Sequence, residues 1–285
     1  MPEGWQWDST LFRGSAPHYT RGRLPYAPGY AEVLAAVLGP GGAGRLLDAG
    51  CGPGTVALDM AWHVSEVVGL DPDADMLAEA GRRAGALGIR NVRWVHGRAE
   101  DLPAGLGMFD AVVFAQSFHW TDRERVAAAV RDMLAPGGAF VLLSDRKDPP
   151  PDPRPLPLPA PPYERLAELV RAHLGPVRRA GQGVLEHGTP GREELVLGPA
   201  GFEGPERYVV PAGEVVVRTA DDLVAWVFSR SDSAPHLFAD KAAAFEREVR
   251  EALAAASPNG RFAERLQASA IRIWRKPRRA PLRGR

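Results

Sequence analysis

The stretch "LLDAGCGPGT", residues 46–55, decides the fold class of this chain. Two leucines lead into Asp48, and glycines then fall on alternate positions, at Gly50, Gly52 and Gly54. A strand that ends in a glycine-rich turn and opens a helix brings bare backbone close to a ligand, with the helix N-terminus behind it. The stretch therefore predicts a ligand-binding turn at the end of a first strand.

The spacing of these glycines departs from the dinucleotide fingerprint. Dinucleotide-binding folds use G-x-G-x-x-G, and their pyrophosphate lies on the helix N-terminus. Here the order is G-x-G-x-G, and Thr55 stands where the last glycine of that fingerprint would be. Asp48 at the end of the first strand would repel a pyrophosphate and attract an ammonium group. NAD is therefore the less favoured ligand, and an NAD-dependent oxidoreductase remains an alternative function.

Regular alternation surrounds the turn from residue 45 to residue 145. Short runs rich in Leu, Val and Phe are expected as strands, and they alternate with helical segments. The expected strands cover residues 45–50, 66–71, 92–97, 109–116 and 139–145, and the helices cover 54–63, 73–87 and 122–134. Such alternation implies right-handed crossovers and a mostly parallel sheet covered on both faces. We predict an α/β, doubly wound Rossmann-like fold.

Acidic residues end the next two predicted strands. Asp71 follows Gly50 by 21 residues, the spacing at which an acid accepts hydrogen bonds from ribose hydroxyls. A purely structural alternative is that Asp71 caps the helix at 73–87. Glu100 and Asp101, in "GRAEDLP", suit the exocyclic amine of adenine, and only one of them need contact it. Together the glycines and acids favour an aminoacyl-nucleoside over a dinucleotide.

Residues 45–145 resemble a class I S-adenosylmethionine-dependent methyltransferase domain. "LLDAGCGPGT" resembles the first motif of that family, "VVGLDPDADML" its ribose motif and "GRAEDLP" its adenine motif. "FDAVVFAQSFHW" and "LAPGGAFVLL" resemble its fourth and fifth strands, and "AQSFHW" with "YTRGRLPY" is similar to bacterial small-molecule methyltransferases. The resemblance implies a seven-stranded sheet whose last strand is antiparallel, and "ASAIRIWRK" suits that strand.

The resemblance also implies S-adenosylmethionine as cofactor and a set of residues that bind it. These residues are Tyr19, Arg23, Asp48, Gly50, Gly52, Gly54, Asp71, Met76, Ala99, Glu100, Asp101 and Gln116. Asp48 would orient the amino group directly or through water, and Met76 would pack on adenine. Gln116, with Tyr19 or Arg23 from the N-terminal arm, would lie near the methionyl carboxylate.

His119 and Trp120 follow the fourth strand, where the resemblance implies that the methyl group is transferred. His119 is a candidate general base near neutral pH, or alternatively a polar wall residue with no role in proton transfer. Trp120 is expected as a wall of the site, because a sulfonium cation favours an aromatic face. Trp226 is a further candidate for the lining.

The expected function is methyl transfer to an O, N or C nucleophile of a small organic acceptor in secondary metabolism. A non-catalytic S-adenosylmethionine-binding protein is the other alternative.

The predicted organisation places this core at residues 31–147. Residues 1–30 are expected to form an N-terminal arm, and residues 148–206 a proline-rich linker and insertion that serves with the arm as a cap. Nine of the fifteen residues at 148–162 are proline, which breaks helices and strand ladders. Residues 207–277, with a strand pair at 207–219, are expected to complete the sheet. Residues 278–285 are expected to be a flexible tail.

Composition limits the partners of the 285-residue chain. Its 35 basic and 35 acidic residues cancel, so we expect a small-molecule acceptor and neither a nucleic acid nor a membrane as partner. A single cysteine, scattered histidines and no apolar leader predict a cytoplasmic protein without disulfides or a bound metal, either a monomer or a homodimer. Abundant Arg, Ala, Gly and Pro with only three lysines suggest a bacterial source.

Overall fold

The computed structural model describes residues 8, 10–39, 44–146, 154–176, 179–180, 183–184 and 192–278. The chain divides into two compact units. We call residues 29–146, 189–210 and 269–285 the sheet unit, and residues 1–28, 147–188 and 211–268 the helical unit. The predicted flexible tail lies outside the described residues except for Arg278.

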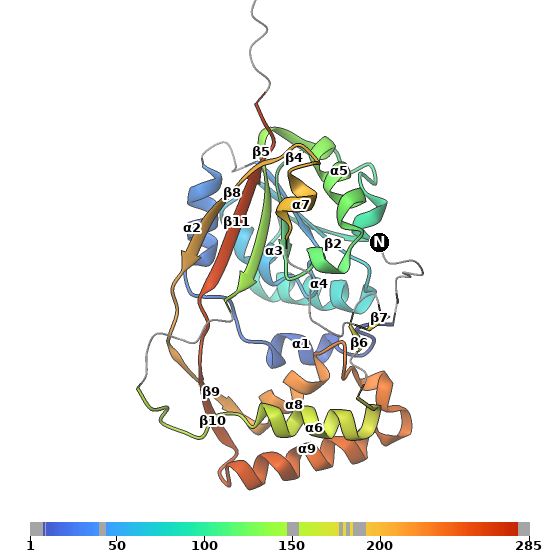
Figure 1. Cartoon of the computed structure of the whole chain (residues 1–285), viewed down its shortest axis with the longest axis vertical. Helices are drawn as coiled ribbons and strands as arrows, with labels where there is room; N and C mark the ends of the chain where they lie inside the picture. The colour runs from blue at the N-terminus through green and yellow to red at the C-terminus, as the bar shows by residue number, and fades with distance from the viewer. Residues whose placement is uncertain are drawn as a thin grey trace, which may run out of the picture. The chain divides into compact units, whose positions relative to one another are not determined.

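The sheet unit contains a seven-stranded sheet in the order β3-β2-β1-β4-β5-β11-β8 (Figure 1). Its strands are β1 (Arg45–Ala49), β2 (Glu66–Asp71), β3 (Val92–His96), β4 (Phe109–Ala115), β5 (Leu134–Asp145), β8 (Glu203–Val210) and β11 (Ser269–Arg275). Strands β1 to β5 pair in parallel, and β11 is antiparallel to both β5 and β8. The predicted doubly wound fold with an antiparallel last strand is confirmed.

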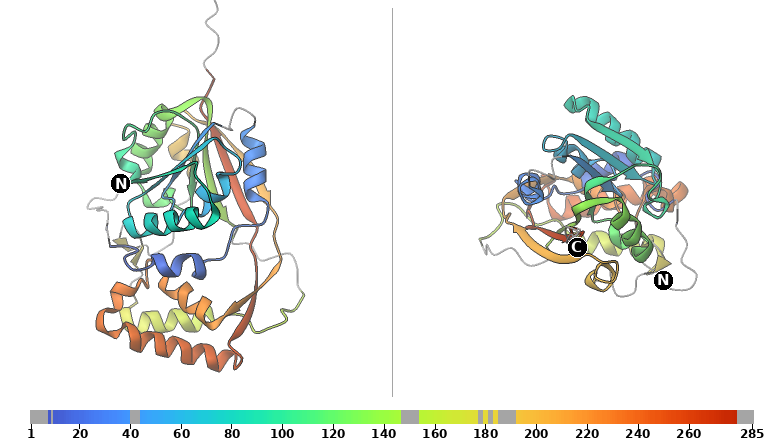
Figure 2. Two further views of the ribbon diagram at one scale, coloured as in Figure 1. Left: turned by 180° about the vertical axis from the view of Figure 1, so that it is seen from behind. Right: turned by 90° about the horizontal axis from the view of Figure 1, so that it is seen from above.

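Helices cover both faces of this sheet (Figure 2). They are α2 (Tyr30–Leu38), α3 (Thr55–Met60), α4 (Ala74–Leu87), α5 (Arg123–Met133) and α7 (Glu194–Leu197), with 3-10 helices η2 (Ala99–Asp101) and η3 (Phe118–Trp120). On one face, Val112 and Phe114 of β4 share a buried core with Val126 and Val130 of α5 and with α7. The other face is covered by α3 and α4, which contact β1, β2 and β3. Because successive residues of a strand point to opposite faces, the apolar runs of β1 and β4 serve both cores.

The strand pair predicted at 207–219 is wrong in its pairing. β8 pairs with β11 of the sheet unit, whereas β9 (Val215–Thr219) pairs with β10 (Arg261–Arg265) in a separate two-stranded sheet. Each strand is apolar enough to pair, but its partner lies more than forty residues along the chain, so the local sequence pattern cannot select it. Residues 207–277 are thus divided between the units, and so are residues 148–206, with α6 in the helical unit and α7 in the sheet unit.

The helical unit has its own apolar core. It contains α1 (Ala16–Gly22), α6 (Tyr163–Leu174), β6 (Arg179–Ala180), β7 (Gly183–Val184), β9, α8 (Ala220–Phe228), η4 (Pro235–Lys241), α9 (Ala242–Ala256) and β10. Leu166, Leu223, Phe245 and Phe262 are fully buried there. A Cβ at Gly22 would lie 2.4 Å from the carbonyl oxygen of Ala225, so α1 packs against α8 backbone to backbone. No helix in the described part of the chain is long and apolar enough to cross a membrane.

Candidate functional site

The three glycines of the turn after β1 have different surroundings. All three have positive φ, 72° at Gly50, 53° at Gly52 and 76° at Gly54, which favours glycine. A Cβ at Gly50 would lie 2.6 Å from Cβ of Ser117, and one at Gly54 would lie 2.7 Å from a ring carbon of Trp94. A Cβ at Gly52 would meet nothing within 4 Å. Gly52 is therefore where a ligand has room to approach the backbone, while the outer two glycines make room for side chains of the protein.

Asp71, at the carboxyl end of β2, is bound to this turn. Its Oδ2 accepts a hydrogen bond from the backbone N–H of Gly52 at 2.7 Å, and its Oδ1 accepts one from Asp73 N–H at 2.9 Å. The cap of α4 is Asp73, whose side chain accepts from Met76 N–H, so the helix-cap alternative for Asp71 is wrong. Burial raises the pKa of Asp71 to about 6. Met76, the predicted adenine contact, is buried in the first turn of α4.

Asp48 occupies the N-terminus of α3. Its Oδ2 accepts a hydrogen bond from the backbone N–H of Ala57 at 3.0 Å, in the first turn of the helix. The side chain is fully buried, and this burial raises its pKa to about 7, with the nearby charge of Asp71 acting in the same direction. In dinucleotide-binding folds the helix N-terminus receives the pyrophosphate. Here a side-chain carboxyl group of the protein already lies there, which disfavours a second anion.

Glu100 and Asp101 of η2 differ in how they are held. Glu100 is 6% exposed, and its Oε1 accepts a hydrogen bond from Asp122 N–H at 2.9 Å, just before α5. Arg98 lies 3.5 Å from its other carboxylate oxygen. Asp101 is exposed, and its Oδ2 accepts a hydrogen bond from the backbone N–H of Arg98 at 3.3 Å. The carboxylate of Glu100 therefore joins η2 to the start of α5, and Asp101, two residues after the buried Ala99, is the acid that is exposed.

The segment after β4 brings the predicted acceptor-side residues together. Gln116 has a positive φ of 57°, and its Nε2 donates to Oδ2 of Asp145 at the end of β5, at 3.3 Å. Its backbone carbonyl accepts a hydrogen bond from the indole N–H of Trp120 at 3.2 Å. The rings of His119 and Trp120 lie 4.8 Å apart, centroid to centroid. Gln116, His119 and Trp120 thus form one local group at the carboxyl edge of β4 and β5.

Three further predicted residues belong to the helical unit. Arg23 donates to the carbonyl oxygen of Ser229 at 2.9 Å, and its guanidinium lies 5.1 Å from the ring centroid of Tyr19. Trp226 packs on Tyr163 at 4.5 Å between centroids. These contacts lie within the helical unit, so the predicted cofactor contacts of Tyr19 and Arg23 and the lining role of Trp226 stay predictions.

Sequence reasoning missed three residues that hold the turn. Arg83 of α4 donates to the carbonyl oxygen of Pro53 at 2.7 Å, and Trp94 of β3 fills the space beside Gly54. Ser117 donates to the carbonyl oxygen of Ala49 at 2.5 Å. A signal for Trp94 does exist in the sequence, because a glycine inside an apolar strand marks a close approach. That glycine is Gly69, which pairs with Trp94, and a Cβ at Gly69 would lie 2.5 Å from its ring.

Cys51 of the turn is not a reactive thiol. Burial, together with the nearby negative charges of Asp71 and Asp48, raises its pKa well above the ordinary value. A neutral buried thiol is a poor nucleophile and a poor metal ligand. Among the described residues, no three His, Cys, Asp or Glu side chains gather in an arrangement that would hold a metal ion.

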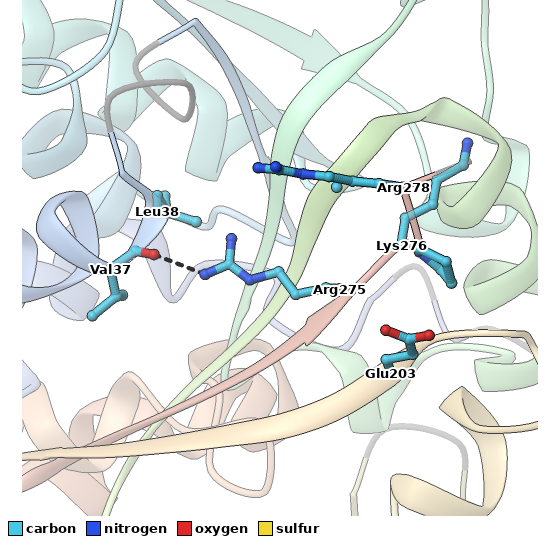
Figure 3. A pocket seen from close by; sticks show the side chains of 8 residues that line it. Val37, Leu38, Glu203, Arg275, Lys276 and Arg278 are labelled. Carbon is cyan, nitrogen blue, oxygen red and sulfur yellow. Dashed lines mark hydrogen bonds between the residues drawn. The ribbon is translucent and has the colours of Figure 1, made fainter. Parts of the chain in front are cut away.

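A cavity of about 600 Å³ lies at the opposite edge of the sheet, beside the start of β5 and the end of β11. Figure 3 shows Arg275 reaching toward α2, where it donates to the carbonyl oxygen of Val37 at 2.7 Å. Glu203, Lys276 and Arg278 also line this cavity. It lies at the amino ends of the parallel strands, and ligands of open α/β sheets bind at the carboxyl ends, so this cavity is not the candidate site.

Comparison with known proteins identifies the family. Residues 46–138 match the family described as "Methyltransferase domain". A protein of Mycobacterium tuberculosis named as an uncharacterized methyltransferase is 31% identical over 225 residues, which cover 79% of this chain and 78% of that protein. The chain belongs to the class I S-adenosylmethionine-dependent methyltransferases.

Two further similarities agree with this assignment. The methyltransferase is 34% identical over 140 residues to the malonyl-[acyl-carrier protein] O-methyltransferase of Enterobacter lignolyticus, covering 48% of this chain and 53% of that protein. The crystal structure of YcgJ from Bacillus subtilis shares the fold, with a TM-score of 0.50 and 20% identity over 88% of this chain and 98% of that one. The chain is an enzyme with S-adenosylmethionine as methyl donor, so the NAD-dependent and non-catalytic alternatives are wrong.

The residues of the turn fit this cofactor. Within the described part of the chain, Oδ1 of Asp48 is buried and accepts no hydrogen bond, which leaves an acceptor for an ammonium group or for a water that it binds. Gly52 has open space beside its Cα, and Asp71 lies next to it with a carboxylate suited to hydroxyl donors. An aminoacyl-nucleoside has an amine for Asp48 and a ribose diol for Asp71, and the open space at Gly52 lets it approach the backbone closely.

Proposed function

We propose that the methyltransferase transfers its methyl group to an O, N or C nucleophile of a small organic acceptor bound beside His119 and Trp120. One observation carries this proposal. The segment that holds both residues is bonded directly to the strand that opens the glycine turn, through the hydrogen bond from Ser117 Oγ to the carbonyl oxygen of Ala49 at 2.5 Å. In the proposal, the donor side and the acceptor side of the reaction meet at the carboxyl ends of β1 and β4.

The chain's contribution to the chemistry is mainly alignment. When bound, S-adenosylmethionine supplies a methyl carbon that is already activated by its positively charged sulfur. In the proposal Asp71 accepts from the ribose hydroxyls, Gly52 lets the ligand approach, and Asp48 holds the amino group directly or through water. Met76, Ala99 and Asp101 or Glu100 hold the adenine. Fixing two reactants in line removes an entropic barrier worth up to about 7–11 kcal/mol.

Trp120 is proposed as an aromatic wall that favours positive charge and excludes water. Its indole N–H is bound to the backbone carbonyl of Gln116, which restricts the rotation of the ring. A cation over an aromatic face gains about 0.5–2 kcal/mol, more when it is desolvated. The side-chain amide of Gln116, held by Asp145, is proposed to lie near the methionyl carboxylate.

His119 has two proposed roles, which depend on the acceptor. A nucleophile that must lose a proton needs a base, and the imidazole of His119 would take it. A nucleophile that is already unprotonated needs no base, and His119 would then only line the acceptor site. Replacement of His119 by Gln would lower kcat by about 10²–10⁴-fold in the first case and would raise KM with little change in kcat in the second.

A small acceptor, of the kind used in secondary metabolism, is supported by two observations. The formal net charge of the chain is zero, which provides no general attraction for a nucleic-acid backbone. The name of the Enterobacter lignolyticus relative states O-methylation of a malonyl unit on an acyl-carrier protein, so the reacting group of that acceptor is small although its carrier is a protein.

The test is release of S-adenosylhomocysteine from S-adenosylmethionine in the presence of panels of small phenols, carboxylic acids, amines and activated carbon acids. Parallel reactions with total RNA and with unfolded protein serve as controls. Turnover confined to one small-molecule class supports the proposal. Turnover only with RNA or protein contradicts it.

A further inference from the structure

Ser117 joins the glycine turn to the acceptor-side segment. It is 9% exposed, and its Oγ donates to the carbonyl oxygen of Ala49, the last residue of β1. A Cβ on Gly50, the next residue, would come within 2.6 Å of Ser117 Cβ and 3.1 Å of its Oγ. The side chain thus lies directly against the first two residues of the turn.

The backbone of Ser117 is hydrogen-bonded to Trp120 of the acceptor-side segment. Its carbonyl oxygen accepts a hydrogen bond from Trp120 N–H at 2.9 Å, which closes the 3-10 helix η3. The preceding carbonyl, that of Gln116, binds the indole N–H of the same tryptophan. One residue therefore contacts the turn through its side chain and η3 through its main chain.

Hydrogen bonds hold the turn at its start and near its end, and we expect it to respond to a ligand as a unit. The N–H groups of Gly50 and Cys51 both donate to the carbonyl oxygen of Leu70, at 2.7 and 3.1 Å. Arg83 holds the carbonyl of Pro53 from the far side. Packed interiors transmit displacement because they contain no space to absorb it. A ligand that contacts Gly52 therefore acts on Ala49 and Gly50 as well, and through them on Ser117.

We infer that Ser117 is a positioning residue, which keeps the glycine turn in its ligand-binding shape and couples cofactor binding to the placement of Trp120 and His119. The inference rests on the proposed function for the acceptor-side role of those two residues. The competing interpretation is that Ser117 is a buried serine with a satisfied hydroxyl and no link to the cofactor.

The chain offers a matched control in Ser233. This serine is fully buried in the helical unit, and its Oγ donates to the carbonyl oxygen of Val227 at 2.6 Å. Ser117→Ala and Ser233→Ala remove the same chemical group from the same kind of bond. They differ in whether the carbonyl that loses its donor belongs to the glycine turn.

The experiment measures two quantities in the intact protein, the Kd of S-adenosylhomocysteine by calorimetry and the change in Trp120 fluorescence on binding. The Trp120 signal is identified by subtracting the signal of Trp120→Phe. Loss of one buried hydrogen bond at the turn should weaken binding about tenfold in Ser117→Ala, and the Trp120 change should be lost at saturating ligand. Ser233→Ala should keep the wild-type Kd within about twofold and the full Trp120 change.

Two outcomes overturn the inference: a wild-type Kd with a full Trp120 change in Ser117→Ala, or equal losses in Ser117→Ala and Ser233→Ala. If Ser117→Ala does not fold, Ser117→Cys keeps the volume with a weaker donor and should show an intermediate Kd, and an unchanged Kd there overturns the inference equally. Neither readout needs an acceptor, so failure here is distinct from failure of the proposed function, which would appear as turnover only with RNA or protein.

Discussion

Buried charge is treated differently in the two units. In the helical unit Arg218, 4% exposed, donates to Glu264 at 2.8 Å and to the carbonyl oxygens of Gly22 and Asp222. In the sheet unit Asp48 is fully buried with one carboxylate oxygen bonded and the other without a partner among the described residues. Buried polar groups are normally satisfied, because an unsatisfied one costs about 1–3 kcal/mol. The satisfied network is therefore structural, and the unsatisfied group points to a ligand.

The pKa values agree with this contrast. Burial raises the pKa of Asp48 to about 7 and that of Asp71 to about 6. The ionised form of each carboxyl group is therefore destabilised in the free protein. Perturbed groups of this kind gather at functional sites. The sheet unit carries destabilised acids at its carboxyl edge, whereas the buried arginine of the helical unit secures α1 to β9 and β10.

The largest expected effect is on cofactor affinity in Asp71→Ala. Two charge-assisted hydrogen bonds to ribose are worth about 3–6 kcal/mol together, so the Kd of S-adenosylhomocysteine should rise by about 10²–10⁴-fold while the protein stays folded. Asp73→Ala is the matched control. It removes the cap of α4 and should cost about 1 kcal/mol of stability with little change in Kd. Calorimetric titration distinguishes them, and equal Kd values in the two variants would refute the ribose assignment.

The next effect is on stability in the helical unit. Arg218→Ala leaves Glu264 buried without its cation and releases the carbonyl of Gly22, so the free energy of unfolding should fall by about 3–5 kcal/mol. Arg250→Ala removes an exposed arginine paired with Asp221 and should cost less than about 1 kcal/mol. Urea unfolding followed by circular dichroism measures both. A small loss in Arg218→Ala would show that this buried network does not hold the unit together.

Two glycine variants separate ligand approach from packing within the turn. Gly54→Ala places a methyl group against Trp94 and should cost about 2–4 kcal/mol of stability. Gly52→Ala has open space and should cost only the strain of its positive φ, about 1–2 kcal/mol, yet it should weaken S-adenosylhomocysteine binding by at least about tenfold. Thermal unfolding and calorimetry on both variants test this. Unimpaired binding in folded Gly52→Ala would mean that the ligand does not approach there.

Both the stability of the sheet unit and its affinity for the cofactor are expected to depend on pH. The folded pKa values of Asp48 and Asp71, about 7 and about 6, exceed the value of about 4 expected when unfolded. The folded state therefore binds more protons between about pH 4 and 7. The stability contributed by these groups is present at pH 4 and is lost as the pH rises through 6 and 7.

Cofactor affinity should change in the opposite direction over the same range. An ammonium group and a ribose favour ionised carboxylates, so binding of S-adenosylhomocysteine should strengthen by about tenfold from pH 5.5 to 7.5 and should release protons at pH 6.5. Calorimetry in two buffers of different ionisation enthalpy detects that release, and Asp48→Asn should reduce it. Proton uptake on binding would contradict the assignment.

The features that sequence could predict are local ones. The strands β1 to β5, the glycine turn and the acids that end β1, β2 and β3 each depend on residues close along the chain, so period and spacing were enough. The contacts that hold the turn are long-range, since Ser117 is 68 positions from Ala49 and Arg83 is 30 positions from Pro53. No periodicity encodes such pairs. The partners of β8 and β9 were unpredictable for the same reason.

Sequence also could not distinguish residues of one type from each other. The three glycines look equivalent in "GCGPG", but only their neighbours in space show that Gly52 is the open one. Glu100 and Asp101 are adjacent acids, and only the fold shows that the first is bonded to Asp122 at the start of α5. Identity at a position is a local property, whereas the role of that position depends on what the rest of the chain places beside it.

We propose that this turn accepts an adenosyl amino acid and disfavours a dinucleotide, because Asp48 already occupies the helix N-terminus. The most direct measurement is thermal unfolding of the protein with S-adenosylhomocysteine and, separately, with NAD. At about a hundredfold excess over Kd a true ligand adds about 2.7 kcal/mol, a shift in Tm of about 5–10 °C for a chain of this size. We predict that shift with S-adenosylhomocysteine and none with NAD. A shift with NAD alone would contradict the account.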